Sequence, residues 1–112
     1  MLSDELVKLP EEISGQEKKL LAISIQLVAK KREIDLWELN QARNIAEANE
    51  DGKKLYSNEA IRTAELESRK LSKGQLYQEL ADLDYLKKTE EIELNYLNNK
   101  FKMFRTLIGG RE

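Results

Sequence analysis

Neighbouring carboxylates are the residues of this sequence whose types and spacing come nearest to a catalytic site. They are Glu11 with Glu12, Glu90 with Glu91, and Asp82 with Asp84. General acid–base catalysis needs two carboxylates in different environments within a cleft, whereas pairs along a charged helix are solvated alike. The 112-residue chain has no His and no Cys, so it lacks the commonest general base, the commonest transition-metal ligand and any thiolate. We therefore expect no enzymatic activity, catalytic residue, cofactor or metal.

The C-terminal segment is the best candidate for a binding site. No acidic residue occurs between Asn95 and Arg111, and Lys100, Lys102 and Arg105 lie in that segment. Cations are favoured at a helix C-terminus by the helix dipole, which is a sufficient explanation. The alternative is a nucleic-acid contact in which these cations bind phosphates beside aromatic residues that stack on bases. The net charge of −2 adds no general attraction for nucleic acid.

An acidic turn gives a third interpretation. Glu47, Glu50 and Asp51 precede Lys53 and Lys54 in the middle of the chain. An acidic tip on a helical hairpin could enter the channel of a host nuclease or polymerase and inhibit it. Ordinary turn chemistry, with the lysines offsetting the charge, is the simpler explanation.

Apolar spacing predicts the elements that position these residues. Leu6, Ile13, Leu20, Leu27 and Ile34 recur every seven residues in the first half. The second half keeps steps of four and three residues through much of its length, and 40% of the chain is hydrophobic. This is the spacing of a helix that packs along another helix, and it argues against disorder.

The breaks in the chain set the expected boundaries. Pro10 fits the first turn of a helix, so we predict a helix over 11–48. Asp51-Gly52 is the clearest turn signal, within a connection over 49–57. Ser57 or Asn58 can cap a short helix over 58–71. Ser72 with Gln75 resembles a capping box before a long helix over 75–108. The sequence thus predicts one all-α domain over 1–112 containing a long antiparallel helical hairpin.

One face of each long helix should form the seam between them. Polar residues interrupt this seam at Gln16 and Lys30 on the first helix and at Lys87 and Glu90 on the second, where they can fix the register. A contact between Lys30 and Glu90 is compatible with antiparallel pairing. The apolar seam residues that we expect to matter most for packing or oligomerisation are Leu20, Leu27, Ile34, Trp37, Leu83, Leu94, Leu97, Phe101 and Phe104.

Each long helix also carries a second apolar set, about 150° around its axis from the seam. A single hairpin buries one stripe per helix, so the second would form an exposed patch larger than monomers usually tolerate. Association of hairpins, most simply into a four-helix bundle that is a dimer or tetramer, would bury it. The alternative is that the short helix covers part of it. The second sets are Leu21, Ile25, Val28, Leu36 and Leu39, and Tyr85, Ile92, Tyr96, Met103 and Leu107.

The chain from about residue 45 onward resembles small coiled-coil proteins of tailed phages and prophages. The resemblance begins with the segment 51–59 (DGKKLYSNE), followed by Arg62, Glu65 and Leu66, and continues in the segment 93–97 (ELNYL) with Phe101, Phe104 and Arg105. The relatives break their helix at Asp-Pro, where this chain has Ser72-Lys73-Gly74. The resemblance implies a setting among replication and recombination genes and leaves the activity open.

These observations favour a non-enzymatic coiled-coil accessory protein that acts through protein–protein contacts in phage DNA replication or recombination. Nucleic-acid binding through the basic C-terminal end and inhibition of a host enzyme are the alternatives. The partner protein is unknown. The chain has no apolar run near 18 residues and no basic, then apolar, N-terminal segment, so we expect a cytoplasmic protein that does not enter a membrane.

Overall fold

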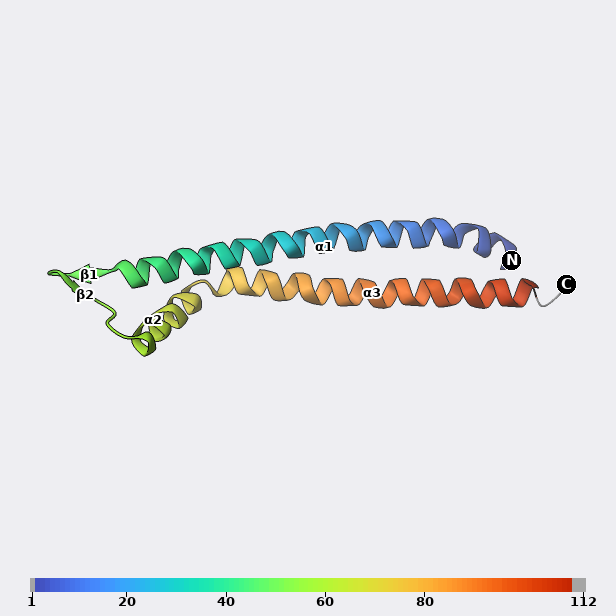
Figure 1. Ribbon diagram of the computed structural model, residues 1–112. Helices are drawn as coiled ribbons and strands as arrows, with labels where there is room; N and C mark the ends of the chain where they lie inside the picture. The colour runs from blue at the N-terminus through green and yellow to red at the C-terminus, as the bar shows by residue number, and fades with distance from the viewer. Residues whose placement is uncertain (1, 110–112) are drawn as a thin grey trace. The chain divides into compact units, whose positions relative to one another are not determined.

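The computed structural model describes residues 2–109, and nearly all of them are helical. The elements in chain order are α1 (Leu2–Glu47), β1 (Asn49–Glu50), β2 (Lys53–Lys54), α2 (Glu59–Ser72) and α3 (Gly74–Gly109) (Figure 1). The predicted all-α class is therefore confirmed. Within residues 2–109, no helix combines the length and the apolar character needed to cross a bilayer.

Packing divides the chain into two compact units. The terminal unit comprises Met1–Leu27 and Leu83–Glu112, and the tip unit comprises Val28–Asp82. In the terminal unit, α1 and α3 run side by side in opposite directions (blue and orange-red in Figure 1). The buried cluster of this unit joins Leu9 of α1 to Leu97 and Phe104 of α3.

Helix α1 begins at Leu2 rather than at residue 11, so the predicted helix start is wrong. Pro10 lies inside the helix, where a missing hydrogen bond and a steric clash cost about 3 kcal/mol. Leu9 is only 1% exposed, and burying a leucine side chain contributes about 1.5–3 kcal/mol. Leu6 and Ile13 pack on the same cluster. This apolar contact offsets the cost of the proline and extends the helix.

The tip unit contains a miniature β-hairpin where the sequence predicts only a turn. β1 and β2 pair antiparallel, with Asn49 opposite Lys54 and Glu50 opposite Lys53. Asp51 and Gly52 have φ angles of 52° and 78°. Positive φ at both central residues is typical of a type I′ turn, for which Asp-Gly is a preferred sequence. The dipeptide thus reverses the chain between α1 and α2.

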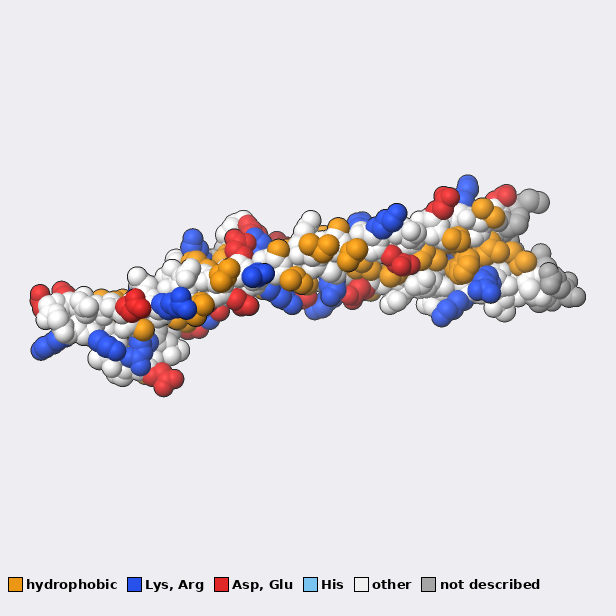
Figure 2. Space-filling model, turned by 45° about the horizontal axis from the view of Figure 1, so that its top comes forward, with side chains coloured by type: hydrophobic (Ala, Val, Ile, Leu, Met, Phe, Trp, Pro, Cys, Tyr) orange, Lys and Arg blue, Asp and Glu red, His pale blue; other side chains and the backbone are white. Residues whose placement is uncertain are grey.

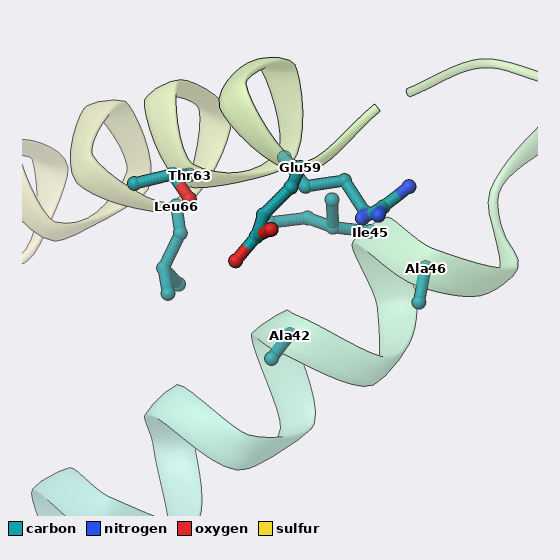
Figure 3. Close-up of a pocket in the computed structure, with 7 residues that line it drawn as sticks. Ala42, Ile45, Ala46, Glu59, Thr63 and Leu66 are labelled. Carbon is teal, nitrogen blue, oxygen red and sulfur yellow. The ribbon is translucent and has the colours of Figure 1, made fainter. Parts of the chain in front are cut away.

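Helix α2 begins after Asn58, as predicted for one of two candidate caps. The Asn58 side-chain oxygen accepts a 2.9 Å hydrogen bond from the backbone N–H of Ile61. Figure 3 shows where α2 approaches α1, at a hollow whose α1 wall consists of Ala42, Ile45 and Ala46. Short alanine side chains leave room for the approach, and Ile45 is buried beneath it.

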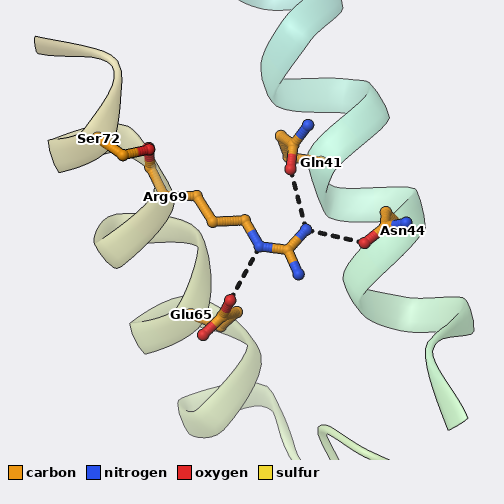
Figure 4. A network of polar contacts seen from close by, with 5 residues as sticks. All are labelled: Gln41, Asn44, Glu65, Arg69 and Ser72. Carbon is orange, nitrogen blue, oxygen red and sulfur yellow. Dashed lines mark hydrogen bonds and ion pairs between the residues drawn. The ribbon is translucent and has the colours of Figure 1, made fainter.

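Arg69 and Lys70 of α2 both bind side chains of α1; Figure 4 shows the contacts of Arg69, and Lys70 pairs with Glu38 at 3.7 Å. The Arg69 guanidinium donates hydrogen bonds of 2.9 Å to Gln41 and 2.8 Å to Asn44, both side-chain oxygens of α1. Its Nε also pairs with Glu65 one turn earlier in α2, at 2.9 Å. Because Arg69 is held by both helices, it fixes how α2 lies against α1.

The helix is interrupted between α2 and α3, as the sequence indicates, but the capping differs from the predicted capping box. Ser72 is the last residue of α2, and its hydroxyl donates a 2.6 Å hydrogen bond to the Arg69 carbonyl. It therefore does not act as the predicted N-terminal cap of α3. Lys73 leaves helical geometry, and its carbonyl accepts the 3.0 Å bond from the N–H of Leu76 that starts the first turn of α3.

Candidate self-association surface

The faces of α1 and α3 that pack against each other form what we call the inner seam. Its residues follow one another at alternating steps of three and four. All of the predicted seam residues lie on it. Each of them is buried or half-buried. The buried members are Leu27, Ile34, Leu97 and Phe104, and the half-buried members are Leu20, Trp37, Leu83, Leu94 and Phe101. The structure thus assigns these side chains to packing within one copy of the chain.

A polar layer interrupts the inner seam of the terminal unit. The Gln16 amide donates to the Glu90 carboxylate at 2.5 Å and to the Glu90 carbonyl at 2.9 Å. Lys19 pairs with the same carboxylate at 3.0 Å. The hydrogen bond from Gln16, followed by that from Lys19, lowers the pKa of Glu90. Glu90 therefore pairs with Gln16 and Lys19 rather than with Lys30, the partner considered from the sequence.

The tip unit has its own polar layers on the inner seam. Lys30 pairs with Glu79 at 2.6 Å and with Glu33 at 3.0 Å, and these carboxylates raise the pKa of Lys30. The Tyr77 hydroxyl donates a 2.6 Å hydrogen bond to Glu38, and burial together with this bond raises the pKa of Tyr77. Polar groups on the seam are satisfied, so the seam can be packed in one register.

The outward face of α3 carries large apolar residues that the described part of the chain leaves exposed. Tyr85, Ile92, Tyr96, Met103 and Leu107 are 46–75% exposed, whereas Leu97 and Phe104 on the inner seam of the same helix are 7% exposed. The second apolar set expected from the sequence is therefore present on the surface of a single copy. It belongs entirely to the terminal unit.

Three uncharged polar residues complete this face, and the sequence reasoning missed them. Thr89, Asn99 and Thr106 are exposed between the apolar residues. The polar and apolar residues of this face, taken together, follow one another at alternating steps of four and three residues. This spacing was the signal available in the sequence. We call the resulting set the outer stripe of α3; its members are Tyr85, Thr89, Ile92, Tyr96, Asn99, Met103 and Thr106.

The threonine hydroxyls of the outer stripe are already hydrogen-bonded within the helix. Thr89 donates a 3.0 Å hydrogen bond to the Tyr85 carbonyl, and Thr106 donates a 2.9 Å bond to the Lys102 carbonyl. Burying a hydroxyl is costly unless it is hydrogen-bonded. These two threonines can therefore enter an interface without losing hydrogen bonds. The outer stripe runs from Tyr85 to Thr106 without a charged member, over about 31 Å of helix.

The outward face of α1 also exposes its second apolar set. The members in the terminal unit are Leu21 and Ile25, and those in the tip unit are Val28, Leu36 and Leu39; all are 47–66% exposed. Within the tip unit α2 contacts α1 at the Gln41 and Asn44 side, so Leu36 and Leu39 stay uncovered. The alternative that the short helix covers part of a second set therefore does not hold for Leu36 and Leu39, which are 53% and 47% exposed. Apolar side chains reach the visible surface in a broken row in Figure 2.

The basic C-terminal end is arranged around aromatic rings. The Lys100 ammonium lies 5.9 Å from the ring centroid of Tyr96 and 5.7 Å from that of Phe104, and Arg105 lies 5.7 Å from that of Phe101. Lys102 and Arg105 are exposed and line a shallow hollow with Thr106. Because Phe104 is buried and Phe101 half-buried, both phenylalanine rings take part in core packing, whereas Tyr96, Lys102 and Arg105 are exposed.

The acidic tip has lysines beside its carboxylates. Glu50 lies directly opposite Lys53 in the β-hairpin register, and Asp51 occupies the turn itself. Among the residues that the structure describes, no group of three or more His, Cys, Asp or Glu side chains could hold a metal ion. The tip thus shows turn chemistry, with exposed charges of both signs.

Comparison with known proteins gives no family and no function for this chain. No protein-family model, curated protein or solved structure matches this chain.

Proposed function

We propose that this chain is a non-enzymatic helical interaction protein that self-associates through the outward faces of its long helices. The outer stripe of α3 is the observation that carries the proposal. It has coiled-coil spacing and no charge, and its apolar members are about half to three-quarters exposed in one copy. A largely apolar, uncharged face that is exposed in one copy often marks a binding surface.

The composition of the stripe fits an interface better than a core. Tyr and Met are enriched at protein–protein contacts, and tyrosine can bury its ring while keeping its hydroxyl bonded. The buried residues on the inner seam of the same helix are Leu97 and Phe104. Two copies would supply the four long helices of a four-helix bundle, and a dimer or tetramer is the expected state.

The setting that we propose is that of an accessory factor in phage or prophage DNA replication or recombination. It is supported only by the sequence resemblance of the segments 51–66 and 93–105. In this setting the assembled bundle would act by binding another protein.

Solution mass by light scattering, with and without a short single-stranded DNA, tests this proposal. A dimer or tetramer whose mass does not change with DNA supports an interaction bundle. A mass of 13.0 kDa for the chain at all concentrations up to about 0.1 mM would contradict self-association.

The second candidate function is nucleic-acid binding through Lys100, Lys102 and Arg105. The outward-facing hollow between Lys102 and Arg105 is the observation that favours it. Phosphate contacts release counterions, so affinity should fall steeply as salt rises. Filter binding at low salt should then retain DNA, and the Lys102→Ala and Arg105→Ala variants should retain less. Absence of retention at low salt would contradict this function.

The third candidate is an inhibitor of a host nuclease or polymerase acting through Glu50 and Asp51. The position of Lys53 opposite Glu50 in the hairpin register adds a positive charge beside the carboxylates on which this function depends. A stable enzyme partner that is lost in a Glu50→Lys, Asp51→Lys variant would support it. Capture that is unchanged in that variant would contradict it.

A further inference from the structure

The edges of the outer stripe carry charges in an order that complements the same helix reversed. One edge consists of Leu86, Glu93, Lys100 and Leu107, at intervals of seven residues. In the opposite direction this order becomes Leu, Lys, Glu, Leu. Neither Glu93 nor Lys100 forms an ion pair with another residue between 2 and 109. The two charges therefore lie beside an exposed apolar face, and neither has an ion-pair partner among residues 2–109.

We propose that two copies pair their α3 helices antiparallel about a twofold axis, with Glu93 of each copy opposite Lys100 of the other. This inference rests on the proposed self-association and specifies its register. In antiparallel pairing the core layers would join Ile92 to Met103 and Tyr96 to Asn99 of the second copy. The outermost layer would join Thr89 to Thr106, and Leu86 would meet Leu107 along the charged edge.

Charge excludes the neighbouring antiparallel registers. A shift of one heptad in one direction would place Glu93 opposite Glu93 of the second copy. A shift in the other direction would place Lys100 opposite Lys100. Like charges directly opposed across a helix pair are destabilising, whereas the proposed register forms two attractive pairs by symmetry. It also leaves Lys88 beside the C-terminal end of the other helix, where cations are favoured.

A parallel arrangement is less favourable on two grounds. It would pair Glu93 with Lys88 of the second copy, but Lys88 already binds Asp84 of its own helix at 3.0 Å. It would also leave Lys100 beside Asn95 and align the two helix dipoles in the same direction. Antiparallel pairing opposes the dipoles and gives both unpaired charges a partner.

A hollow on the stripe has the shape that this register needs. It is lined by Tyr96, Asn99, Lys100 and Met103, which are residues i, i+3, i+4 and i+7 of one helix. Four residues with this spacing form the hole that receives one side chain in coiled-coil packing. In the proposed register that side chain is Tyr96 of the second copy. The two tyrosines would therefore insert reciprocally at the centre of the interface, where aromatic residues contribute most to binding.

Disulfide trapping tests the register, because the chain contains no cysteine. We expect an equimolar mixture of the Ile92→Cys and Met103→Cys variants to form a mixed disulfide dimer under mild oxidation. A dimer of either variant alone should not cross-link. In the antiparallel register, the thiols of its two copies would lie 11 residues apart, about 16 Å along the helix axis. Cross-linking of either variant alone would overturn the antiparallel register. A dimeric mass without any cross-link would overturn the use of this face, and a monomeric natural chain would contradict the proposed function as well.

Charge exchange provides the matched control. The Glu93→Lys and Lys100→Glu variants should each weaken dimerisation about tenfold, because two attractive pairs become repulsive. The double exchange should restore most of the affinity. Equal affinity of all four proteins, measured by sedimentation at several concentrations, would contradict the pairing of Glu93 with Lys100. Circular dichroism checks that each variant stays helical.

Discussion

The two faces of α3 share one spacing but differ in what covers them. The inner seam carries Leu97 and Phe104, which α1 buries, and it tolerates the charged residue Glu90 because Gln16 and Lys19 bind it. The outer stripe carries tyrosine, threonine, asparagine and methionine, has no charge, and is uncovered. A face buried by its own chain can include a charge when a partner is fixed nearby. The proposed pairing of two copies would explain why the outer stripe is uncharged.

The difference separates folding from association. Removal of an inner-seam side chain should unfold the single copy, whereas an outer-stripe substitution should leave each copy folded and change only its assembly. The two effects are distinguishable because helicity and mass are measured independently.

The largest expected effect is that of Leu97→Asp on the inner seam. An unpaired charge buried beside Leu9 and Phe104 should cost more than about 4 kcal/mol, a large part of the stability of a small domain. Thermal unfolding followed by circular dichroism should show a large loss of the helical transition, and Leu27→Asp or Leu94→Asp should act in the same direction. Retained helicity with an unchanged midpoint would contradict the assignment of Leu97 to the seam.

The matched substitution on the outer stripe is Ile92→Asp. Ile92 is 70% exposed in one copy, so the charge stays solvated and helicity at low concentration should be retained. In an assembly the same charge would be buried, which should weaken association by at least about 2 kcal/mol, or some thirtyfold. Light scattering should show a shift to lower mass. If the variant formed an assembly of the same mass as the natural protein, the interface would lie elsewhere.

Acid should weaken the inner seam through its carboxylates. The folded pKa of Glu90 is lowered by Gln16 and Lys19, and that of Glu79 by Lys30. A lowered folded pKa means that the stabilisation is present above the unfolded value of about 4.3 and is lost as the pH falls through the folded pKa. The unfolding temperature should therefore drop below about pH 4. The Glu90→Gln variant should show a smaller drop, and an identical pH profile would contradict the role of Glu90.

The smallest expected effect is that of Thr89→Val on the outer stripe. The Thr89 hydroxyl bonds its own helix, so valine keeps the shape and loses only an internal hydrogen bond. Association should change by less than about 0.5 kcal/mol. Sedimentation equilibrium measures this, and a strong loss of affinity would show that the hydroxyl contacts the second copy.

Periodicity explains how much of this architecture could be predicted. The inner seam and the second apolar sets follow from spacing, because a helix converts spacing into faces. The start of α1 could not be predicted from spacing, because burial of Leu9 against α3 outweighs the local preference of Pro10 for the first turn of a helix. The ion-pair partner of Lys30 could not be predicted from spacing either. Which residue of α3 lies opposite Lys30 depends on the length of the β-hairpin and of α2, which connect α1 to α3. Thr89, Asn99 and Thr106 were missed because only apolar residues were counted.

The most direct measurement is the alkylation rate of a thiol on the outer stripe at high and low protein concentration. In the natural chain there is no other cysteine to react. Ile92→Cys and the adjacent Glu91→Cys are both exposed positions in one copy. We predict that Ile92→Cys is protected at high concentration and becomes reactive on dilution, while Glu91→Cys reacts rapidly at both. Equal, rapid alkylation of the two variants at every concentration would contradict burial of the outer stripe by a second copy.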